Sequence, residues 1–414
     1  MNSKAILILA ILLSISGCEL RANRTDSEPA PKQLPVVLKP IEARVHNPAA
    51  SLVEVKRNRI GSAAGSDGRI QHAQFVDEQN GWAGTGKALF STSDGGTSWR
   101  RLNFQAPDDS SIESLFFIDE LHGWLAVTKQ AYNERYGLGN SSRLFSTKDG
   151  GNTWKEQINL ADEVTIKEIN FFNAQHGLAI GARTIDQPRE QGPPYAEIAA
   201  WRTDDGGEAW TEISDGLKTA LRNETGSRGG FGWNIRWLSS TQVLLLTKAG
   251  EVLNTSDRGT TWRAVVSLKD ERPHGQISSV GYYKLLLNTE KQINIIAGAV
   301  GDEGYWGDLV VNGDDKSWAS YELDLIPIFD GVFLSQDEVL ACGMDMKFAA
   351  ENQKPTTAGV ILHSLDHGKS WTVIHRSNIT ETFISLSRVG SNTFYAVSDA
   401  GTVLTFAFLQ IRQN

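Results

Sequence analysis

Residues 92–99 read Thr-Ser-Asp-Gly-Gly-Thr-Ser-Trp, and this stretch decides the fold because close copies of it recur along the chain. The second copy reads Thr-Lys-Asp-Gly-Gly-Asn-Thr-Trp at 147–154. Its aspartates recur at intervals of roughly 52 to 57 residues, which is typical of a repeat architecture. The remaining copies lie at 203–210, 255–262 and 364–371, with a shorter one that lacks the glycine pair at 312–318.

Each motif stands in the same frame of short apolar runs. A β-rich run such as 112–118 comes first, and a turn with a Gly-Trp pair follows, as at Gly123 and Trp124. A third run such as 143–146 leads into the motif, whose Trp opens a fourth run. Alternating runs bounded by Gly, Asn and Asp indicate short antiparallel strands. Four strands in a unit of about 54 residues predict one blade of a propeller.

The repeats predict seven blades. Six motifs give six blades, and a further three-stranded set follows at 383–386, 393–397 and 402–408. We expect its missing fourth strand at Ser51–Lys56, because closing the ring with an N-terminal strand removes an exposed sheet edge. The sequence therefore predicts an all-β protein over residues 51–414, a seven-bladed β-propeller of four-stranded antiparallel blades.

The shared chemistry of the motif is that of a turn between the third and fourth strands. We expect the Asp carboxylate to accept backbone N–H groups, the glycines to supply positive φ, and the Trp to bury a large area. Metal binding is disfavoured, since the run from Asp204 to Gly206 lacks the spacing and final Glu of a calcium loop. The predicted structural residues are Asp94, Asp149, Asp205, Asp257, Asp366, Trp99, Trp154, Trp210, Trp262 and Trp371.

The N-terminus carries an export signal. Lys4 precedes a short apolar run at 5–13, which is typical of a secretory signal peptide and too short to span a bilayer. Residues 15–18 resemble the lipobox of bacterial lipoproteins, which implies cleavage after residue 17 and lipidation of Cys18. The alternative is an ordinary signal peptide with an incidental Cys. We expect a lipid-anchored envelope protein facing the periplasm, with the inner or outer membrane left open.

Residues 18–50 differ in composition from the rest of the chain. Five of the 12 prolines fall between Pro29 and Pro48. A stretch of this kind predicts a semi-extended tether without a packed core.

Composition excludes several function classes. A net charge of -9 argues against nucleic acid as a partner. The eight His residues show no ligand-like spacing, and His122 and His176 are predicted to be turn residues, so no metal or cofactor is expected. Cys342 lies in an apolar strand run, which predicts a small buried residue rather than half of a disulfide with Cys18.

The runs 75–82 and 117–124, together with 89–99 and 144–154, resemble the photosystem II stability/assembly factor-like family. The motif itself resembles the Asp-box, or BNR repeat, of sialidases and sortilins. The resemblance covers about residues 51–408 and implies a seven-bladed propeller that binds a membrane protein during complex assembly. The arginines of this chain are scattered, whereas the photosynthetic members carry an arginine-rich patch, so the partner is not carried over.

Long connections are predicted to gather on one face. In a propeller, the loops between second and third strands share a face with the links between blades, and long loops on a rigid scaffold usually carry function. The long connections lie at 129–142, 184–196, 214–232, 269–276, 301–308 and 344–358. The predicted partner-binding residues on them are Tyr132, Arg135, Tyr136, Arg189, Tyr195, Arg222, Arg228, Trp233, Arg272, Tyr305 and Trp306.

Two other functions remain open from the sequence. A sialidase-like glycoside hydrolase would need a carboxyl pair, and the candidates on this face are Asp302, Glu303, Asp345 and Glu351. Against this, sialidases have six blades, and the Arg-Ile-Pro run that precedes their first Asp-box is absent here. A glycan-binding module would instead stack sugars on the aromatic residues of the same face. We expect a non-catalytic scaffold that binds a membrane or envelope protein.

Overall fold

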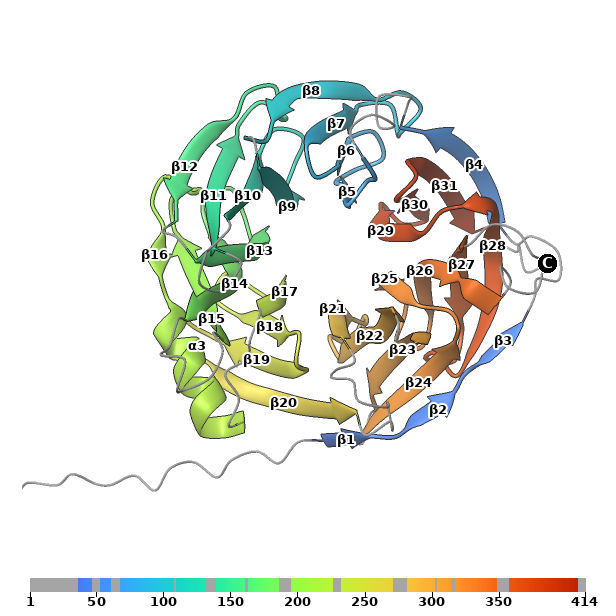
Figure 1. Ribbon diagram of the computed structural model, residues 1–414. Coiled ribbons are helices and arrows are strands. Elements are labelled where there is room, and N and C mark those ends of the chain that lie inside the picture. Colours follow the sequence, from blue (N-terminus) through green and yellow to red (C-terminus); the bar gives the residue numbers. More distant parts are fainter. Residues whose placement is uncertain are drawn as a thin grey trace, which may run out of the picture. The chain divides into compact units, whose positions relative to one another are not determined.

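Seven small β-sheets stand around a central axis in the computed structural model (Figure 1). Each sheet is one blade, with its first strand nearest the axis and its last strand at the rim. The seven-bladed all-β fold is therefore confirmed. The structure describes residues 36–46, 53–60, 68–107, 109–131, 139–160, 163–185, 195–225, 232–270, 281–301, 304–313, 317–347 and 357–408.

Six blades follow one another along the chain. Blade 1 contains β5 (His72–Phe75), β6 (Gly81–Gly84), β7 (Ala88–Thr92) and β8 (Arg100–Gln105). Blade 2 contains β9 (Ser110–Phe117), β10 (Gly123–Ala131), β11 (Gly139–Thr147) and β12 (Lys155–Asn159). Blade 3 contains β13 (Val164–Phe171), β14 (Gly177–Ile185), β15 (Tyr195–Thr203) and β16 (Thr211–Glu212). Blade 4 contains β17 (Gly232–Trp237), β18 (Val243–Thr247), β19 (Glu251–Thr255) and β20 (Arg263–Asp270). Blade 5 contains β21 (Gly281–Leu287), β22 (Ile293–Gly301), β23 (Gly304–Asn312) and β24 (Trp318–Asp324). Blade 6 contains β25 (Ile328–Phe333), β26 (Val339–Asp345), β27 (Ala358–Ser364) and β28 (Ser370–Thr380).

The seventh blade joins the two ends of the propeller. It contains β29 (Phe383–Val389), β30 (Thr393–Ser398) and β31 (Thr402–Phe408), and its outer strand is β4 (Val53–Arg59) from the N-terminal part. Strand β4 pairs with β31 in antiparallel register from Val53 opposite Phe408 to Arg59 opposite Thr402. The predicted closure by an N-terminal strand is confirmed, shifted by two to three residues from the predicted bounds.

Residues 36–46 form a strap on the outer rim, so the prediction of a tether without packing was wrong for this segment. The strap consists of β1 (Val36–Leu38), β2 (Pro40–Glu42) and β3 (Arg44–His46). These strands pair in parallel with β20, β24 and β28, so blades 4, 5 and 6 have five strands each. Leu38 and Ala43 face inward and are buried. Short pairing segments and these two inward side chains hold the strap to the rim.

A helix follows the last strand of blade 3 and packs against its sheet. The link at 214–232 was predicted to be a loop, but it begins with α3 (Ser214–Ala220) and the π-helical turn η2 (Leu221–Thr225). Ser214 Oγ accepts the backbone N–H of Ala200, 3.1 Å away on β15, and Leu217 is fully buried. The helix therefore covers the edge of β15 where β16 is only two residues long.

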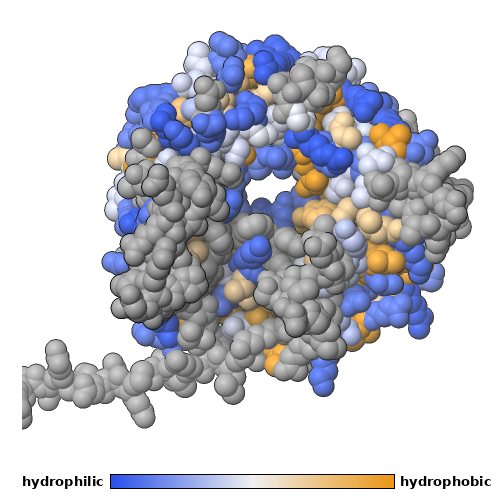
Figure 2. Space-filling view, viewed as in Figure 1, coloured by the Kyte–Doolittle hydropathy of each residue, from blue (hydrophilic) through white to orange (hydrophobic). Residues whose placement is uncertain are grey.

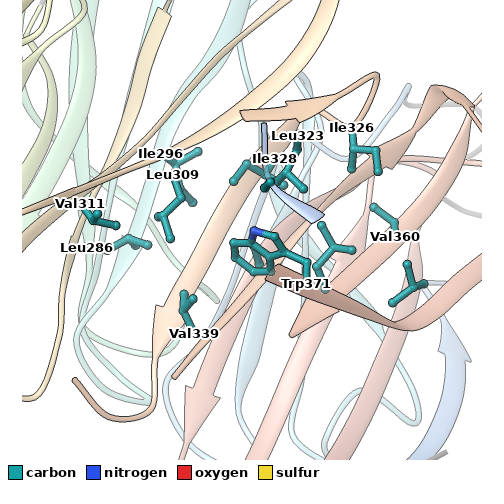
Figure 3. Close-up of a cluster of buried hydrophobic side chains, with 14 of the residues drawn as sticks. Leu286, Ile296, Leu309, Val311, Leu323, Ile326, Ile328, Val339, Val360 and Trp371 are labelled. Atoms are coloured by element: carbon teal, nitrogen blue, oxygen red, sulfur yellow. The ribbon is translucent and has the colours of Figure 1, made fainter. Parts of the chain in front are cut away.

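The core is repeated around the ring rather than gathered at one centre. The described residues form seven hydrophobic clusters, and each lies between two neighbouring blades. Figure 3 shows the cluster between blades 5 and 6, where Trp371 lies among Leu309, Ile328 and Val360. Each blade is therefore buried on both faces by its two neighbours, so the core is built up from contacts between adjacent repeats.

Candidate partner face and central channel

The repeated motif folds into a closed hydrogen-bonded turn between the third and fourth strands. In blade 2, Asp149 Oδ1 accepts the backbone N–H of Thr153 at 2.9 Å, and Asp149 Oδ2 accepts the Thr153 hydroxyl at 2.7 Å. Thr147 donates its hydroxyl to Asp149 and accepts the N–H of Gly151. Both carboxylate oxygens are thus used to hold the turn.

The same turn recurs at the other four aspartates. Asp94, Asp257 and Asp366 repeat all these bonds, whereas Asp205 keeps the backbone bond but faces Ala209, which has no hydroxyl. Hydrogen bonds from Ser98 lower the pKa of Asp94, and the backbone N–H groups of Thr153 and Ala209 do so for Asp149 and Asp205. At Asp257 and Asp366 burial opposes the hydrogen bonds, which outweigh it and lower the pKa. These aspartates are ionised parts of the scaffold.

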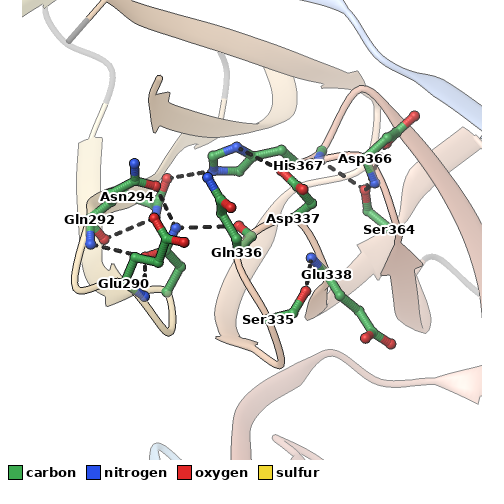
Figure 4. A network of polar contacts seen from close by, with 12 residues as sticks. Glu290, Gln292, Asn294, Ser335, Gln336, Asp337, Glu338, Ser364, Asp366 and His367 are labelled. Carbon is green, nitrogen blue, oxygen red and sulfur yellow. Dashed lines mark hydrogen bonds and ion pairs between the residues drawn. The ribbon is translucent and has the colours of Figure 1, made fainter. Parts of the chain in front are cut away.

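Two turns replace the first glycine by a side chain that reaches the preceding blade. Arg258 has φ +57° and its Nη1 donates to Asp204 of blade 3 at 2.7 Å. His367 has φ +61°, and its Nε2 lies 3.0 Å from Asn294 Oδ1 of blade 5, in the polar network of Figure 4. In both cases a side chain at an unfavourable backbone angle gains a bridge between blades.

The structure places part of the predicted partner face. Tyr195 opens β15, Tyr305 lies beside the β22–β23 turn, and both are half-buried. Arg222 is exposed on η2, with Nη2 3.3 Å from Glu197 Oε1 on β15. Glu197 also pairs with Lys218 of α3. Tyr195, Glu197 and Arg222 therefore form one described corner of the predicted face, on blade 3.

Other predicted residues lie elsewhere. Residues 301–308 were expected to form a long loop, but Val300 pairs with Tyr305 and Gly301 with Gly304 in a tight hairpin. Trp306 is only 8% exposed and belongs to the core between blades 4 and 5, so its prediction as an interface residue was wrong. Trp233 lies within β17 rather than in a loop. The predicted residues that lie outside the described part of the chain are Cys18, Tyr132, Arg135, Tyr136, Arg189, Arg228, Arg272, Asp302, Glu303 and Glu351.

A polar channel follows the axis. Its cavity of about 570 Å³ is lined by side chains from the innermost strands of all seven blades. Figure 2 shows the central opening, with hydrophilic side chains around much of its edge. Sequence reasoning concentrated on the loops and did not predict this site.

One level of the channel wall is a ring of seven polar side chains, which we call the channel ring. Each member contacts the innermost strand of the next blade around the ring. Ser114 Oγ accepts the N–H of Ile169, Asn234 Oδ1 accepts that of Leu285, and Ser385 Oγ donates to Ala73 O. Lys284 Nζ lies 2.6 Å from Asp330 Oδ1. The ring consists of His72, Ser114, Glu168, Asn234, Lys284, Asp330 and Ser385.

The three carboxylates that line the channel are held at every oxygen. Glu113 accepts the Ser111 hydroxyl and pairs with Lys167 at 2.7 Å. Glu168 accepts Asn234 Nδ2 at 2.8 Å and the N–H of Ile235 at 3.2 Å. Asp330 accepts Lys284 and the N–H groups of Gly331 and Leu386. Burial raises the pKa of Glu168, although Arg236 opposes this.

A sequence signal for the ring exists. In blades 1 to 6 the ring residue stands three positions before the large apolar residue that ends the innermost strand, as His72 does before Phe75 and Glu168 before Phe171. A polar residue at the same place in six successive repeats indicates a shared structural position.

The described part of the chain also bears on metal binding, membrane insertion and the predicted roles of three single residues. It holds no group of three or more His, Cys, Asp or Glu side chains that could bind a metal ion. Within the same residues, no helix is long and apolar enough to cross a membrane. Cys342 is buried as predicted, its thiol is free, and burial raises the pKa of that thiol well above the ordinary value. His122 and His176 lie in turns, where Asp119 and Asn173 accept their backbone N–H groups.

Fold and channel together define a closed seven-bladed β-propeller. No family model matches the chain, and no curated protein matches it in sequence. The solved structure of YCF48 bound to D1 peptide is 15% identical with a TM-score of 0.53, covering 88% of this chain and 99% of that one. YCF48 from Cyanidioschyzon merolae is 14% identical with a TM-score of 0.54, covering 87% and 100%.

An enzyme of similar fold is the GH74 xyloglucanase from Xanthomonas campestris. It is 13% identical with a TM-score of 0.52, covering 86% of this chain and 54% of that chain. Identities this low show the shared propeller fold and leave function to the residues themselves.

Proposed function

We propose that the protein is a non-catalytic, lipid-anchored scaffold that faces the periplasm and binds a membrane or envelope protein. The lipid is carried by Cys18, and the partner binds the face that contains Tyr195, Arg222 and Tyr305. Lipidation with several acyl chains anchors a protein stably, where a single chain would be marginal. Binding to the partner supports its assembly or stability.

The observation that carries the proposal is the state of the channel carboxylates. All six oxygens of Glu113, Glu168 and Asp330 accept hydrogen bonds or ion pairs from the protein itself. Glycoside hydrolysis needs two carboxyls flanking a substrate, one as acid and one as nucleophile or base. Carboxylates engaged in holding neighbouring blades favour a scaffold over a hydrolase.

One further observation disfavours a hydrolase, and another supports binding. Asp345, one of the candidate carboxylates, is buried. It accepts hydrogen bonds from Nε and Nη2 of Arg376, at 3.0 and 2.7 Å. YCF48, which shares the fold over nearly its whole length, has been solved with a D1 peptide bound. A propeller of this size and arrangement is thus able to bind a peptide.

The test is crosslinking of the full-length protein in cells, followed by affinity capture and mass spectrometry. The binding-face variant carries Tyr195→Ala and Tyr305→Ala. The control carries Leu121→Ala and Leu365→Ala, two exposed residues in turns of the opposite face. One dominant envelope protein, lost with the first variant and kept with the second, is expected. A saturable hydrolase activity abolished by Glu168→Gln would overturn the proposal.

The anchor is tested separately by the mass of the mature N-terminus. Acyl chains on Cys18 and loss of membrane attachment in Cys18→Ser are expected. A soluble mature protein that retains residues before 18, or lacks acyl chains on Cys18, would contradict the anchor but leave the partner experiment intact.

A further inference from the structure

We propose that the central channel binds a carboxylate group through Arg236. Arg236 lies on β17, one of the innermost strands, and its side chain lines the cavity. Its Nε donates to Leu285 O at 3.0 Å, which fixes the guanidinium against the neighbouring blade. Recognition of the carboxylate depends on channel residues alone. The inference rests on the proposed function only where the carboxylate is taken to come from a partner protein.

Arg236 differs from the other cations of the channel wall. Lys167 and Lys284 are each paired with a carboxylate within 3 Å. Among the described residues that line the cavity, Arg236 and Arg388 are the cations with no carboxylate within 4.0 Å. Arg388 is exposed and donates Nη2 to Ser391 O. The remaining N–H groups of the half-buried Arg236 are therefore available to a ligand in the channel.

The geometry of a guanidinium selects the ligand class. Its planar fork of N–H groups matches the two oxygens of a carboxylate or a phosphate. Three carboxylates, Glu113, Glu168 and Asp330, line the same cavity and would repel a phosphate dianion more strongly than a single carboxylate. The channel thus suits a monoanionic carboxylate on a narrow group.

The charge balance of the channel favours entry of an anion. The lining holds four cations, Lys167, Arg236, Lys284 and Arg388, against the three carboxylates, while burial lowers the pKa of His72 and favours its neutral form. The chain as a whole carries a charge of -9. The cavity thus has a small excess of positive charge inside an acidic protein. Such a cavity concentrates the electric field along its axis.

Two probes carry the test and distinguish the sources of the carboxylate. Butyrate, a monoanion at neutral pH, represents a free small acid, with butyramide as its neutral control. A blocked pentapeptide of Gly and Ser with one central Glu represents an acidic side chain of a partner, with the Gln peptide as its control. Binding of either acid by calorimetry, without binding of its neutral control, is expected. Binding of butyrate alone assigns a free acid, and binding of the peptide alone assigns a partner.

The variants locate the site. Arg236→Gln is expected to weaken binding about tenfold or more, since it removes a charge-assisted bidentate contact. Arg236→Lys keeps the charge and is expected to recover part of the loss. Arg388→Gln removes a cation from the same lining and serves as the control, with less than about a twofold effect expected because its side chain is exposed.

Three results would overturn the proposal. These are equal binding of acidic and neutral probes to the unchanged protein, no binding of either acid at millimolar concentration, and equal losses in Arg236→Gln and Arg388→Gln. The probe comparison needs no variant, so it decides the question even if Arg236→Gln fails to fold. If cells yield no partner but butyrate binds through Arg236, the scaffold proposal fails and the channel proposal stands.

Discussion

The outer rim of blades 4 to 6 and that of blades 1 to 3 protect their last strands in different ways. In blades 4 to 6 the outer strands have 8, 7 and 11 residues, and the strap pairs with three residues of each. In blades 1 to 3 the outer strands have 6, 5 and 2 residues and no strap. Arg100 and Arg101 are exposed on β8, and α3 covers the edge of blade 3.

The difference shows how a propeller manages exposed sheet edges. An unpaired outer strand presents N–H and C=O groups to any other strand, and proteins counter this by covering the edge, shortening it or charging it. Here the strap covers the long outer strands of blades 4 to 6, α3 covers the edge of blade 3, and the shorter outer strand of blade 1 carries charged side chains. We call the two sets the strapped half (blades 4 to 6) and the open half (blades 1 to 3).

The largest effect is expected from removing β4 along with the strap. A chain that begins at residue 48 loses the strap but keeps ring closure, and we expect it to lose roughly 2–4 kcal/mol in free energy of unfolding. A chain that begins at residue 61 also leaves blade 7 without its outer strand. We expect that chain to lose about 5 kcal/mol or more, a large share of the stability of a typical domain.

Denaturant titration and size-exclusion chromatography separate these two truncations. The strapless chain should fold cooperatively but self-associate through β20, β24 and β28. A strapless chain that stays monomeric at high concentration would contradict the role given to the strap.

The motif tryptophans give the next largest effect. Trp371 is 1% exposed and pairs through its backbone with Val45 of the strap, whereas Trp99 in the open half is only partly buried. Trp371→Ala is expected to cost about 3–5 kcal/mol in free energy of unfolding and Trp99→Ala clearly less. In the strapless chain the cost of Trp371→Ala should shrink, because the indole is already more exposed. The three costs to compare are those of Trp371→Ala in the full chain, Trp371→Ala in the strapless chain and Trp99→Ala. If they were equal, the strap would not protect Trp371 from solvent.

Acid should destabilise both halves in two stages. Burial lowers the pKa of His72 in the open half and of His375 in the strapped half below 6.5. The unfolded chain therefore binds more protons than the folded one just below pH 6.5, and stability falls as the pH drops through that value. The turn aspartates have a pKa lowered from 3.8, so their contribution is lost as the pH falls below that value.

Denaturant titrations from about pH 8 to about pH 3 check the two stages. The double variant His72→Gln with His375→Gln should lose the first stage and keep the second, while the exposed His46→Gln should change neither. A first stage that survives in the double variant would assign it to other groups.

The repeat made most of the fold predictable from the sequence. Strand positions, the turns at the five aspartates and the closing strand all follow from a pattern that each blade repeats locally. The strap was missed because Val36–His46 is interrupted by a proline and pairs in segments of three residues, too short to show alternation. Its partners lie more than 200 residues away in the chain, and no local pattern reports such pairing.

The candidate site was predicted less completely. Trp306 was assigned to a long connection at 301–308, yet Gly301 pairs with Gly304, both strands extend to this tight turn, and the indole is buried. The channel ring was missed because its members differ in chemistry from blade to blade, from Ser114 to Lys284. Beyond their common position in the strand, they share a contact with the innermost strand of the next blade, which only the closed ring reveals.

The smallest effect concerns the first glycine of the motif, where the two halves also differ. The open half keeps Gly95, Gly150 and Gly206, whereas blades 4 and 6 of the strapped half carry Arg258 and His367 at positive φ. Arg258→Gly relieves the backbone and removes an exposed contact with Asp204, and these opposing effects should leave the free energy of unfolding within about 1 kcal/mol.

The reverse change in the open half sharpens this comparison. A Cβ at Gly206 would lie 2.6 Å from Ala174 O, and its φ is +78°, so Gly206→Ala should cost about 1–3 kcal/mol in free energy of unfolding. Thermal and denaturant unfolding of the two variants measure the difference. If Arg258→Gly were the more destabilising change, the bridge to Asp204 would outweigh the backbone strain. The side chain at this position would then be a second device, beside the strap, that links neighbouring blades, here blade 4 of the strapped half to blade 3 of the open half.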